Sequence, residues 1–238
     1  MKRILVLLAA ATLLLGSAFA QRLVVGQGSD AISLSPHNVN DQPSARVMRQ
    51  IYDTLVVQTE ALELEPGLAE SWEQVDENTW LFNIRQGVTF HDGSALTASD
   101  VVYTLNRLRD PATAAPAAFL VGFINELTVV DDHTVRLTTN APFAPLLAHL
   151  SHTATSILSE AVVEAAGEDY GTSVVVGTGP FKFVSWQTAS QIVLERNDNW
   201  WGGEVLPAEV VFRPIIEGTV RAIELEAGGI DIAYALEP

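Results

Sequence analysis

The sequence predicts a mixed α/β fold, and three observations in one central stretch point to it. Trp80, Phe82 and Ile84 recur with a period of two, which places three large apolar side chains on one face of a strand. Thr97 is followed three residues later by Asp100, the spacing of a capping box that opens a helix. The apolar stripe expected on that helix is Val101, Val102, Leu105 and Leu108. A strand followed by a capped helix, with no catalytic motif between them, indicates a recognition scaffold.

The rest of the chain consists of further short periodic segments separated by turn residues. The expected strands lie at residues 22–26, 88–90, 127–130, 134–138, 181–186, 191–196, 210–213 and 230–233. The expected helices, besides the one that Thr97 caps, lie at residues 44–56, 142–150, 159–166 and 219–227. Strands and helices mixed along the chain in this way are typical of an α/β architecture.

The composition excludes several classes of protein. Thirteen Lys and Arg residues against 29 Asp and Glu residues give a net charge of −16. Binding to nucleic acid or to an anionic membrane surface requires clustered basic side chains, so neither partner is expected. The chain has no cysteine, which leaves neither a disulfide framework nor thiolate chemistry.

Residues 1–20 have the pattern of an export signal peptide. Lys2 and Arg3 form a charged start, and residues 4–15 form an apolar run that is too short for a membrane span. Ala18-Phe19-Ala20 is the small-x-small pattern that signal peptidase recognises. No cysteine lies near the cleavage point, so no lipid anchor is expected. We therefore expect a periplasmic protein that is not a lipoprotein.

Two motifs resemble parts of known sites but lack the context that those sites need. Residues 26–31 mimic the G-x-G-x-x-A dinucleotide fingerprint, but residues 32–36 do not open a helix that could hold a pyrophosphate. Glu63 and Glu65 would share one strand face, yet nothing apolar or basic lies near enough in sequence to drive their pKa values apart. A charged surface turn is therefore expected at the two glutamates, rather than the acid and base of a secreted hydrolase.

His149 and His152 are the only two histidines whose spacing fits one turn of a helix, as a zinc site requires. No third or fourth ligand lies nearby, and two ligands do not close a metal site. The sequence has no G-x-S-x-G elbow, P-loop or H-E-x-x-H motif. We expect no enzyme activity, no cofactor and no metal site.

Several stretches resemble the peptide and nickel-type substrate-binding proteins of ABC importers, which form family 5 of the solute-binding proteins. The resemblance begins with LAESWE at residues 68–73, the F-x-I-R-x-G-V-x-F-H-D-G run at residues 82–93, and LTASDVVYTL at residues 96–105. It continues with V-x-D-D-x-T-V at residues 129–135, G-T-G-P at residues 177–180 and an N-x-x-W-W-G-G segment at residues 197–203. These motifs occur in order and with close spacing over nearly all of the chain after residue 20.

The resemblance implies a fold like that of a class II periplasmic binding protein. Lobe I would be discontinuous, formed by residues 21–56 and 172–238, with an inserted α+β subdomain at residues 57–171. The second lobe of such proteins, which closes on the ligand, is not accounted for by these residues. On this basis we expect an exposed cleft face and weak or absent ligand affinity for the isolated chain.

The function implied by the resemblance is that of an extracytoplasmic substrate-binding component, which captures peptides and delivers them to an ABC permease in the cytoplasmic membrane. A nickel chelate, glutathione or a sugar would fit the same fold and remain alternatives. A fragment that cannot bind ligand and only associates with a permease or partner chain is another alternative, and a secreted hydrolase is a further one.

The loop before the first helix is the main candidate for ligand contact. It comprises Asn38, Val39, Asn40, Asp41 and Gln42. In peptide-binding relatives the segment at this place offers its backbone to the ligand as a neighbouring strand, so affinity comes from main-chain hydrogen bonds. The alternative is a solvated turn in which Asp41 or Ser44 caps the helix.

Four further residues are weaker candidates for ligand contact, and each also has a structural explanation. Phe119 could face the cleft or pack in the core. Gly177 and Thr178 could approach either a ligand or another strand closely. Trp200 could stack on a ligand or pack between hairpins.

Overall fold

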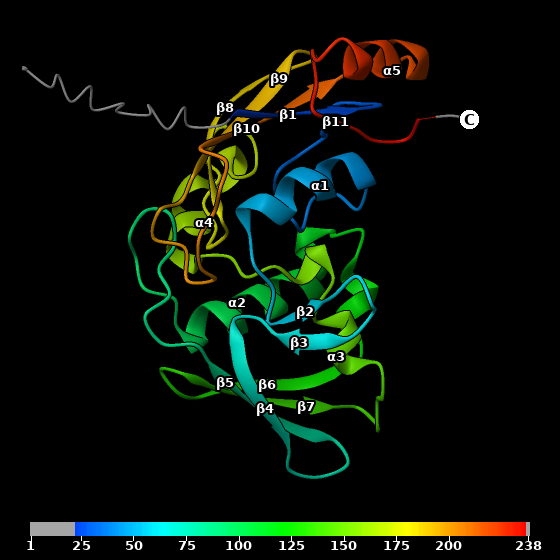
Figure 1. Ribbon diagram of the computed structural model, residues 1–238. Coiled ribbons are helices and arrows are strands. Elements are labelled where there is room, and N and C mark those ends of the chain that lie inside the picture. Colours follow the sequence, from blue (N-terminus) through cyan, green and yellow to red (C-terminus); the bar gives the residue numbers. More distant parts are fainter. Residues whose placement is uncertain (1–21, 237–238) are drawn as a thin grey trace, which may run out of the picture.

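Two β-sheets lie at opposite ends of the molecule, and helix α1 (Gln42–Ile51) lies between them (Figure 1). This computed structural model describes residues 22–236, so the signal peptide expected at residues 1–20 falls outside the described part of the chain. The observed architecture is mixed α/β, as the sequence predicts.

The first sheet has five strands in the order β11, β1, β10, β9, β8. Their bounds in that order are Ile232–Ala233, Arg22–Gln27, Glu209–Pro214, Gln191–Arg196 and Phe181–Gln187. β1 runs parallel to β10 and to β11, with Val24 opposite Val211. β10, β9 and β8 are joined antiparallel. A parallel pair needs a crossover connection, and here most of the chain lies between β1 and β10.

The second sheet has four antiparallel strands in the order β4, β5, β7, β6. Their bounds are Ala69–Gln74, Thr79–Ile84, Thr134–Thr139 and Ile124–Asp131, and a small separate hairpin pairs β2 (Val56–Gln58) with β3 (Leu64–Pro66). The predicted alternation on β5 is confirmed for Phe82 and Ile84, which are buried, whereas Trp80 is partly exposed. Residues 88–90 do not form the predicted strand, and only Thr89 makes an isolated bridge, with Ala95.

The remaining helices are α2 (Ala98–Arg109), α3 (Leu146–His149), α4 (Glu160–Ala166) and α5 (Gly218–Glu226). Short 3-10 segments lie at Pro111–Thr113, Ala118–Val121, Thr153–Thr155 and Gly167–Asp169. The capping box of α2 is confirmed, since Asp100 Oδ2 accepts the Thr97 N–H at 3.0 Å. α1 ends at Ile51, before the predicted end at residue 56, because Tyr52 adopts an extended backbone.

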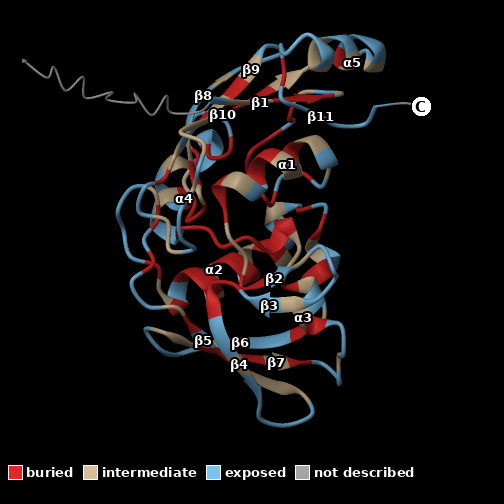
Figure 2. Cartoon of the chain, viewed as in Figure 1, coloured by how far each residue is buried: buried red, intermediate tan, exposed pale blue. Residues whose placement is uncertain are grey.

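The buried side chains form two main cores (Figure 2). One core contains Phe82, Ile84 and Leu105 and lies around the four-stranded sheet; we call this part of the molecule the four-stranded region. The other contains Val25 and Ile192 and lies around the five-stranded sheet and α1; we call it the five-stranded region. Along the sequence, the residues of these two cores belong to the five-stranded region up to Tyr52 and to the four-stranded region from Leu55 to Ile157. From Leu158 onward they belong to the five-stranded region again.

The end of the described chain is held by Arg221, a buried side chain of α5. Its guanidinium donates to the carbonyl oxygens of Ile215, Ile216, Tyr234 and Ala235. No carboxylate of residues 22–236 forms an ion pair with it. Four carbonyl oxygens therefore take the place of a carboxylate partner, and these hydrogen bonds hold residues 234 and 235 against α5.

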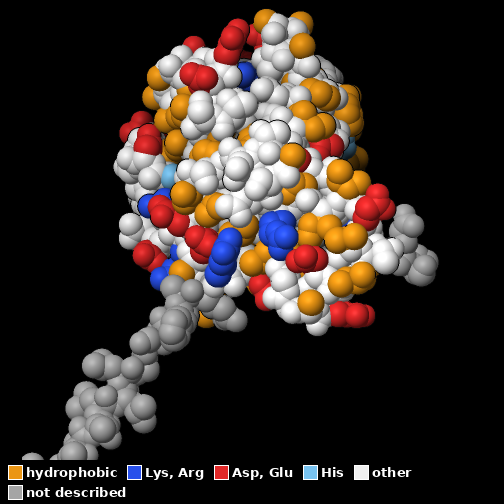
Figure 3. Space-filling model, turned by 90° about the horizontal axis from the view of Figure 1, so that it is seen from above, with side chains coloured by type: hydrophobic (Ala, Val, Ile, Leu, Met, Phe, Trp, Pro, Cys, Tyr) orange, Lys and Arg blue, Asp and Glu red, His pale blue; other side chains and the backbone are white. Residues whose placement is uncertain are grey.

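Large apolar side chains around α5 and β11 are exposed to solvent. They are Ile216, Val220, Ile223, Ile232, Tyr234 and Leu236. Figure 3, which views the molecule from the end that carries the five-stranded sheet, shows hydrophobic side chains over much of this face, interspersed with acidic ones. None of the helices in the described range has the length and apolarity to cross a bilayer.

Candidate ligand-binding site

The loop from Asn38 to Gln42 runs directly into α1 and includes the first residue of that helix, Gln42. Asn38, Asn40 and Gln42 are exposed, whereas the Val39 side chain is buried. Asp41 is the N-cap of α1, and its Oδ1 accepts the Ser44 N–H at 2.9 Å. The backbone N–H and C=O groups of Val39 and Asn40 have no hydrogen-bond partner within residues 22–236. The loop thus both caps the helix and presents unpaired main-chain groups.

Hydrogen bonds to residues far away in the sequence anchor the segment that precedes this loop. The Leu34 N–H donates to Gly171 O at 2.8 Å, and Tyr52 Oη donates to Leu34 O at 2.9 Å. His37 is fully buried, and its Nδ1 accepts from Arg107 at 2.8 Å. Burial, reinforced by the positive charge of Arg107, lowers the pKa of His37 to about 3. The imidazole is therefore neutral and acts as a structural acceptor.

Gly177 and Thr178 lie at the other end of α1. A Cβ on Gly177 would clash with Ile51 O, and Gly179 N–H donates to the same oxygen at 2.8 Å. Thr178 is fully buried, and its hydroxyl donates to Asp53 Oδ2 at 2.9 Å. The small residues of this G-T-G segment allow it to pack directly against the end of the helix.

Trp200 shares the same acceptor. Asp53 Oδ2 also accepts from Trp201 Nε1 at 2.8 Å and from Trp200 Nε1 at 3.4 Å. Burial raises the pKa of Asp53, and the hydrogen bonds from Trp201, Thr178 and Trp200 oppose that rise. Arg85 lies over the Trp201 ring, 4.6 Å from its centroid. One carboxylate, two residues after α1, therefore joins the end of that helix to the G-T-G segment and to residues 197–206, which we call the tryptophan loop.

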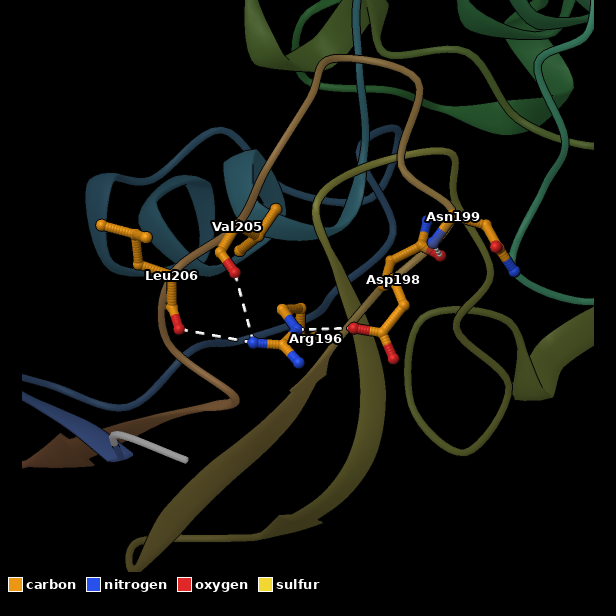
Figure 4. A network of polar contacts seen from close by, with 6 residues as sticks. Arg196, Asp198, Asn199, Val205 and Leu206 are labelled. Carbon is orange, nitrogen blue, oxygen red and sulfur yellow. Dashed lines mark hydrogen bonds and ion pairs between the residues drawn. The ribbon is translucent and has the colours of Figure 1, made fainter. Parts of the chain in front are cut away.

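The tryptophan loop is anchored where it leaves β9. Arg196 Nε donates to Asp198 Oδ1 at 2.6 Å, and its Nη1 donates to the carbonyl oxygens of Val205 and Leu206 at 3.3 and 3.4 Å. Figure 4 shows the guanidinium lying between Asp198 and the returning backbone. Arg196 thus ties the two ends of the loop that carries Trp200 together.

His91 fixes the G-T-G segment from the four-stranded region, a role that the sequence alone did not reveal. Its Nε2 lies 3.0 Å from Gly179 O, and its Nδ1 accepts the Gly177 N–H at 3.3 Å. These partners define the tautomer with the proton on Nε2. Burial lowers the pKa of His91 to about 4. His91, in the H-D-G turn, is thus neutral and hydrogen-bonds the four-stranded region to the G-T-G segment. We call this contact the bracket at His91.

Phe119 is 68% exposed on the 3-10 segment Ala118–Val121. The neighbouring Leu120 O accepts from His149 Nδ1 at 2.8 Å. The His149 ring stands edge-on to the stacked rings of Phe123 and Phe143. Phe119 therefore projects from the surface beside a packed aromatic cluster.

The candidate residues fall into two groups separated by the length of α1. The loop precedes the helix, whereas Gly177, Thr178 and Trp200 gather beyond its end, roughly 15 Å away for a helix of this length. Arg46 and Arg49 lie between the two groups, and their spacings of four and three from Gln42 onward put all three residues on one side of α1. Neither arginine was among the candidates that the sequence suggested, although that spacing could have indicated them.

The two spaced histidines each use Nδ1 in a local hydrogen bond. His149 Nδ1 bonds Leu120 O, and His152 Nδ1 accepts the Ala154 N–H at 3.0 Å. Within the part of the chain that the structure describes, no group of three His, Cys, Asp or Glu residues could hold a metal ion.

Comparison with known proteins gives consistent matches. Residues 63–238 match the family described as bacterial extracellular solute-binding proteins, family 5 Middle. The periplasmic oligopeptide-binding protein OppA of Salmonella typhimurium is 30% identical over 90% of this chain and 43% of its own length. The glutathione-binding protein GsiB of Pectobacterium atrosepticum is 31% identical over 91% of this chain and 42% of its own length.

Solved structures agree with these matches. The periplasmic binding protein DppA from Helicobacter pylori, in complex with the peptide STSA, superposes with a TM-score of 0.80 at 33% identity, over 88% of this chain and 46% of that chain. This chain thus spans under half the length of the relatives that it matches. With a family match over most of its sequence, the chain belongs to the family 5 bacterial extracellular solute-binding proteins.

Proposed function

We propose that this chain is the ligand-capturing part of an extracytoplasmic substrate-binding protein, which takes up peptides for an ABC permease in the cytoplasmic membrane. The single observation that carries the proposal is the unpaired backbone of Val39 and Asn40 on an exposed loop. An extended peptide can pair with such groups as an added strand and leave its side chains free. The oligopeptide-binding and peptide-bound relatives support this choice of ligand.

The proposal includes the organisation expected from the sequence. Residues 21–56 and 172–238 would form lobe I, and residues 57–171 the inserted subdomain, with a second lobe closing on the ligand from outside these residues. Residues 1–20 would direct export to the periplasm. The two cores and the bracket at His91 are compatible with a lobe that carries a firmly attached subdomain.

Glutathione is the second candidate ligand, because GsiB relatives are as similar to this chain as the oligopeptide-binding ones. Glutathione has only three residues and one ordinary peptide bond, so it offers fewer main-chain groups for strand pairing. A longer peptide would therefore make more use of the Val39 and Asn40 backbone.

The test is a titration of the purified, isotope-labelled chain with tetra-alanine, followed by NMR. We expect the amide resonances of Val39 and Asn40 to shift as the peptide pairs with the loop. Asn40→Pro removes the N–H donor and should abolish the shifts, whereas Asn40→Ala keeps it and should bind like the parent chain.

Two results would contradict the proposal. One is a titration that leaves the amides of residues 38–42 unmoved at saturating peptide. The other is an Asn40→Pro variant that melts like the parent chain and still binds with the same affinity, which would show that the main chain of the loop is not the contact.

A further inference from the structure

A buried contact connects the four-stranded region to the residue that enters the candidate loop. Arg107 belongs to α2, whose buried side chains Val101 and Leu105 lie in the core of the four-stranded region. Its Nη1 donates to Nδ1 of His37 at 2.8 Å, and His37 directly precedes Asn38, the first residue of the loop. The loop continues into α1, whose buried apolar residues belong to the core of the five-stranded region. The contact therefore joins the two regions at the start of the loop.

The bond to His37 sets the position of the Arg107 side chain. Arg107 forms no ion pair with a carboxylate of residues 22–236. It is partly exposed and borders two surface cavities, of about 570 and 370 Å³, which Glu164 also borders. A carboxylate in the same open space is an alternative partner for a guanidinium. Because these surroundings are open, the hydrogen bond to the imidazole, and not close packing, directs the arginine toward the loop.

His37 has an energetic cost that a residue serving only to fill the core would avoid. The ring is fully buried, and because a guanidinium can only donate, Nδ1 is the acceptor and the proton lies on Nε2. No acceptor for this Nε2–H lies among residues 22–236. A buried donor without a partner destabilises the folded state, whereas an apolar side chain of similar size does not. The cost indicates that the contact with Arg107 does more than fill the core.

The loop itself has few restraints between its two ends. At its start, the Asn38 N–H donates to a carbonyl oxygen of the preceding turn at 3.1 Å, and at its end Asp41 caps α1. Between them, the backbone groups of Val39 and Asn40 have no hydrogen-bond partner within the described range, although the Val39 side chain is buried. The course of the loop therefore depends on how its ends are held, and His37 holds the first of them.

We propose that the four-stranded region keeps the candidate loop in its peptide-binding conformation, with Arg107 as a positioning residue that acts through His37. This inference rests on the proposed function, since it takes the loop backbone as the contact with the ligand. A loop that is already ordered loses less conformational entropy when a peptide pairs with it. The affinity for peptide then depends on a side chain that belongs to the other region of the molecule.

The experiment uses two arginines of α2 as a matched pair. Arg107→Met removes the donor to His37 and keeps an unbranched side chain. Arg109→Met is the control, because Arg109 is also partly exposed but donates to Asn106 and to the Ile124 carbonyl, within the four-stranded region. The parent chain and both variants are titrated with tetra-alanine, and ¹⁵N relaxation of the free chains reports the order of the loop backbone.

We expect Arg107→Met to loosen the loop and to weaken binding. The order parameters of residues 38–40 should fall from about 0.85, the value of rigid backbone, to below about 0.6. The Kd for tetra-alanine should rise about tenfold, because the binding conformation is then only partly populated. Arg109→Met should leave both quantities at the level of the parent chain. Arg107→Lys keeps a donor with a shorter reach, and intermediate values would identify the hydrogen bond as the cause.

The outcomes separate this inference from the proposed function. A loop in Arg107→Met that is as ordered as in the parent chain overturns the inference, and so does equal loosening by Arg109→Met. A loosened loop with unchanged affinity also overturns it. If Arg107→Met loosens the loop but tetra-alanine does not bind the loop of the parent chain, the positioning role stands and the proposed function fails.

A second variant covers the case in which Arg107→Met does not fold. His37→Leu removes the acceptor together with the unpaired Nε2–H, so it should fold while losing the contact with Arg107. It should lower the order of residues 38–40 and weaken tetra-alanine binding in the same way. A His37→Leu chain whose loop order and affinity match those of the parent chain contradicts the inference.

Discussion

The two regions of this molecule differ in how completely they bury their own apolar surface. In the four-stranded region the exposed apolar side chains, such as Leu62 and Phe119, are spread over separate loops and strands. In the five-stranded region six large apolar side chains are exposed within residues 216–236, around α5 and β11. Arg221 is the only buried residue of α5, so this helix adds almost nothing to the apolar core.

The four-stranded region therefore scatters its exposed apolar side chains, whereas the five-stranded region exposes several of them around one helix and one strand. Large exposed apolar patches are uncommon on folded domains and are typical of interaction sites. The chain also spans under half the length of its relatives.

The largest effect is expected from matched core truncations. Phe82→Ala in β5 and Phe212→Ala in β10 each remove a buried ring, and each should lower the free energy of unfolding by about 3–5 kcal/mol. Because the two rings belong to separate cores, native-state hydrogen exchange should quicken mainly in β5 and β7 for the first variant. For the second variant it should quicken mainly in β1 and β10.

Urea unfolding gives the loss of stability, and exchange measured residue by residue gives its distribution. Equal loss of protection across both sheets in either variant would show that the two regions open as one unit. The two regions would then differ in shape but would not unfold independently of each other.

A smaller effect is expected from acid, at the bracket between the regions. His91 has a folded pKa of about 4 against 6.5 as its ordinary value, so the unfolded chain binds its proton first as the pH falls. The contribution of His91 to stability is therefore complete above pH 6.5 and is lost toward pH 4, by on the order of 2–3 kcal/mol. The measurement is the unfolding free energy between pH 7 and pH 4.

His91→Gln serves as the comparison, because an amide can hydrogen-bond near Gly177 and Gly179 but does not titrate. Its stability should fall less steeply with acid, although His37 contributes a loss of the same sign in both proteins. An unchanged slope in the variant would mean that the acid sensitivity arises elsewhere.

The smallest effect on stability is expected at the open face. Ile223 is 58% exposed, so Ile223→Ser should change the unfolding free energy by less than about 0.5 kcal/mol. It should nevertheless reduce the fluorescence of a bound hydrophobic dye, because it interrupts the apolar cluster around α5. Leu62→Ser, at an exposed and isolated position on a turn, is the control and should leave the dye signal unchanged. Equal effects of the two substitutions would remove the contrast between the regions.

The features that the sequence predicted well depend on neighbouring residues. The capping box at Thr97 and Asp100 spans one turn, and the burial of Phe82 and Ile84 follows from strand periodicity. Prediction failed for the end of α1, which stops at Ile51. Its apolar spacing continues through Leu55, but the extended backbone at Tyr52 carries the chain out of one core and into the other.

The candidate site was only partly predictable for the same reason. Asp41 was named as an N-cap candidate and does cap α1. The role of His91 depends on a bond to Gly179, 88 residues away, and the orientation of Arg49 depends on Thr153, 104 residues away. Nothing in the local pattern around His91 or Arg49 specifies either partner.

Local patterns in the amino-acid sequence specify the elements of this protein: strand faces, helix caps, an acidic composition and a family resemblance carried by ordered motifs. Which of these elements meet depends on the folded chain. Folding pairs β1 with β10 and β11 across most of the chain and gathers Thr178, Trp200 and Trp201 on Asp53. It also places Arg46 and Arg49, which form no ion pair among residues 22–236, on the helix that follows the loop at Val39 and Asn40. The physical reason is that caps and periodicity arise from contacts within a few residues, whereas long-range contacts depend on how the two cores pack.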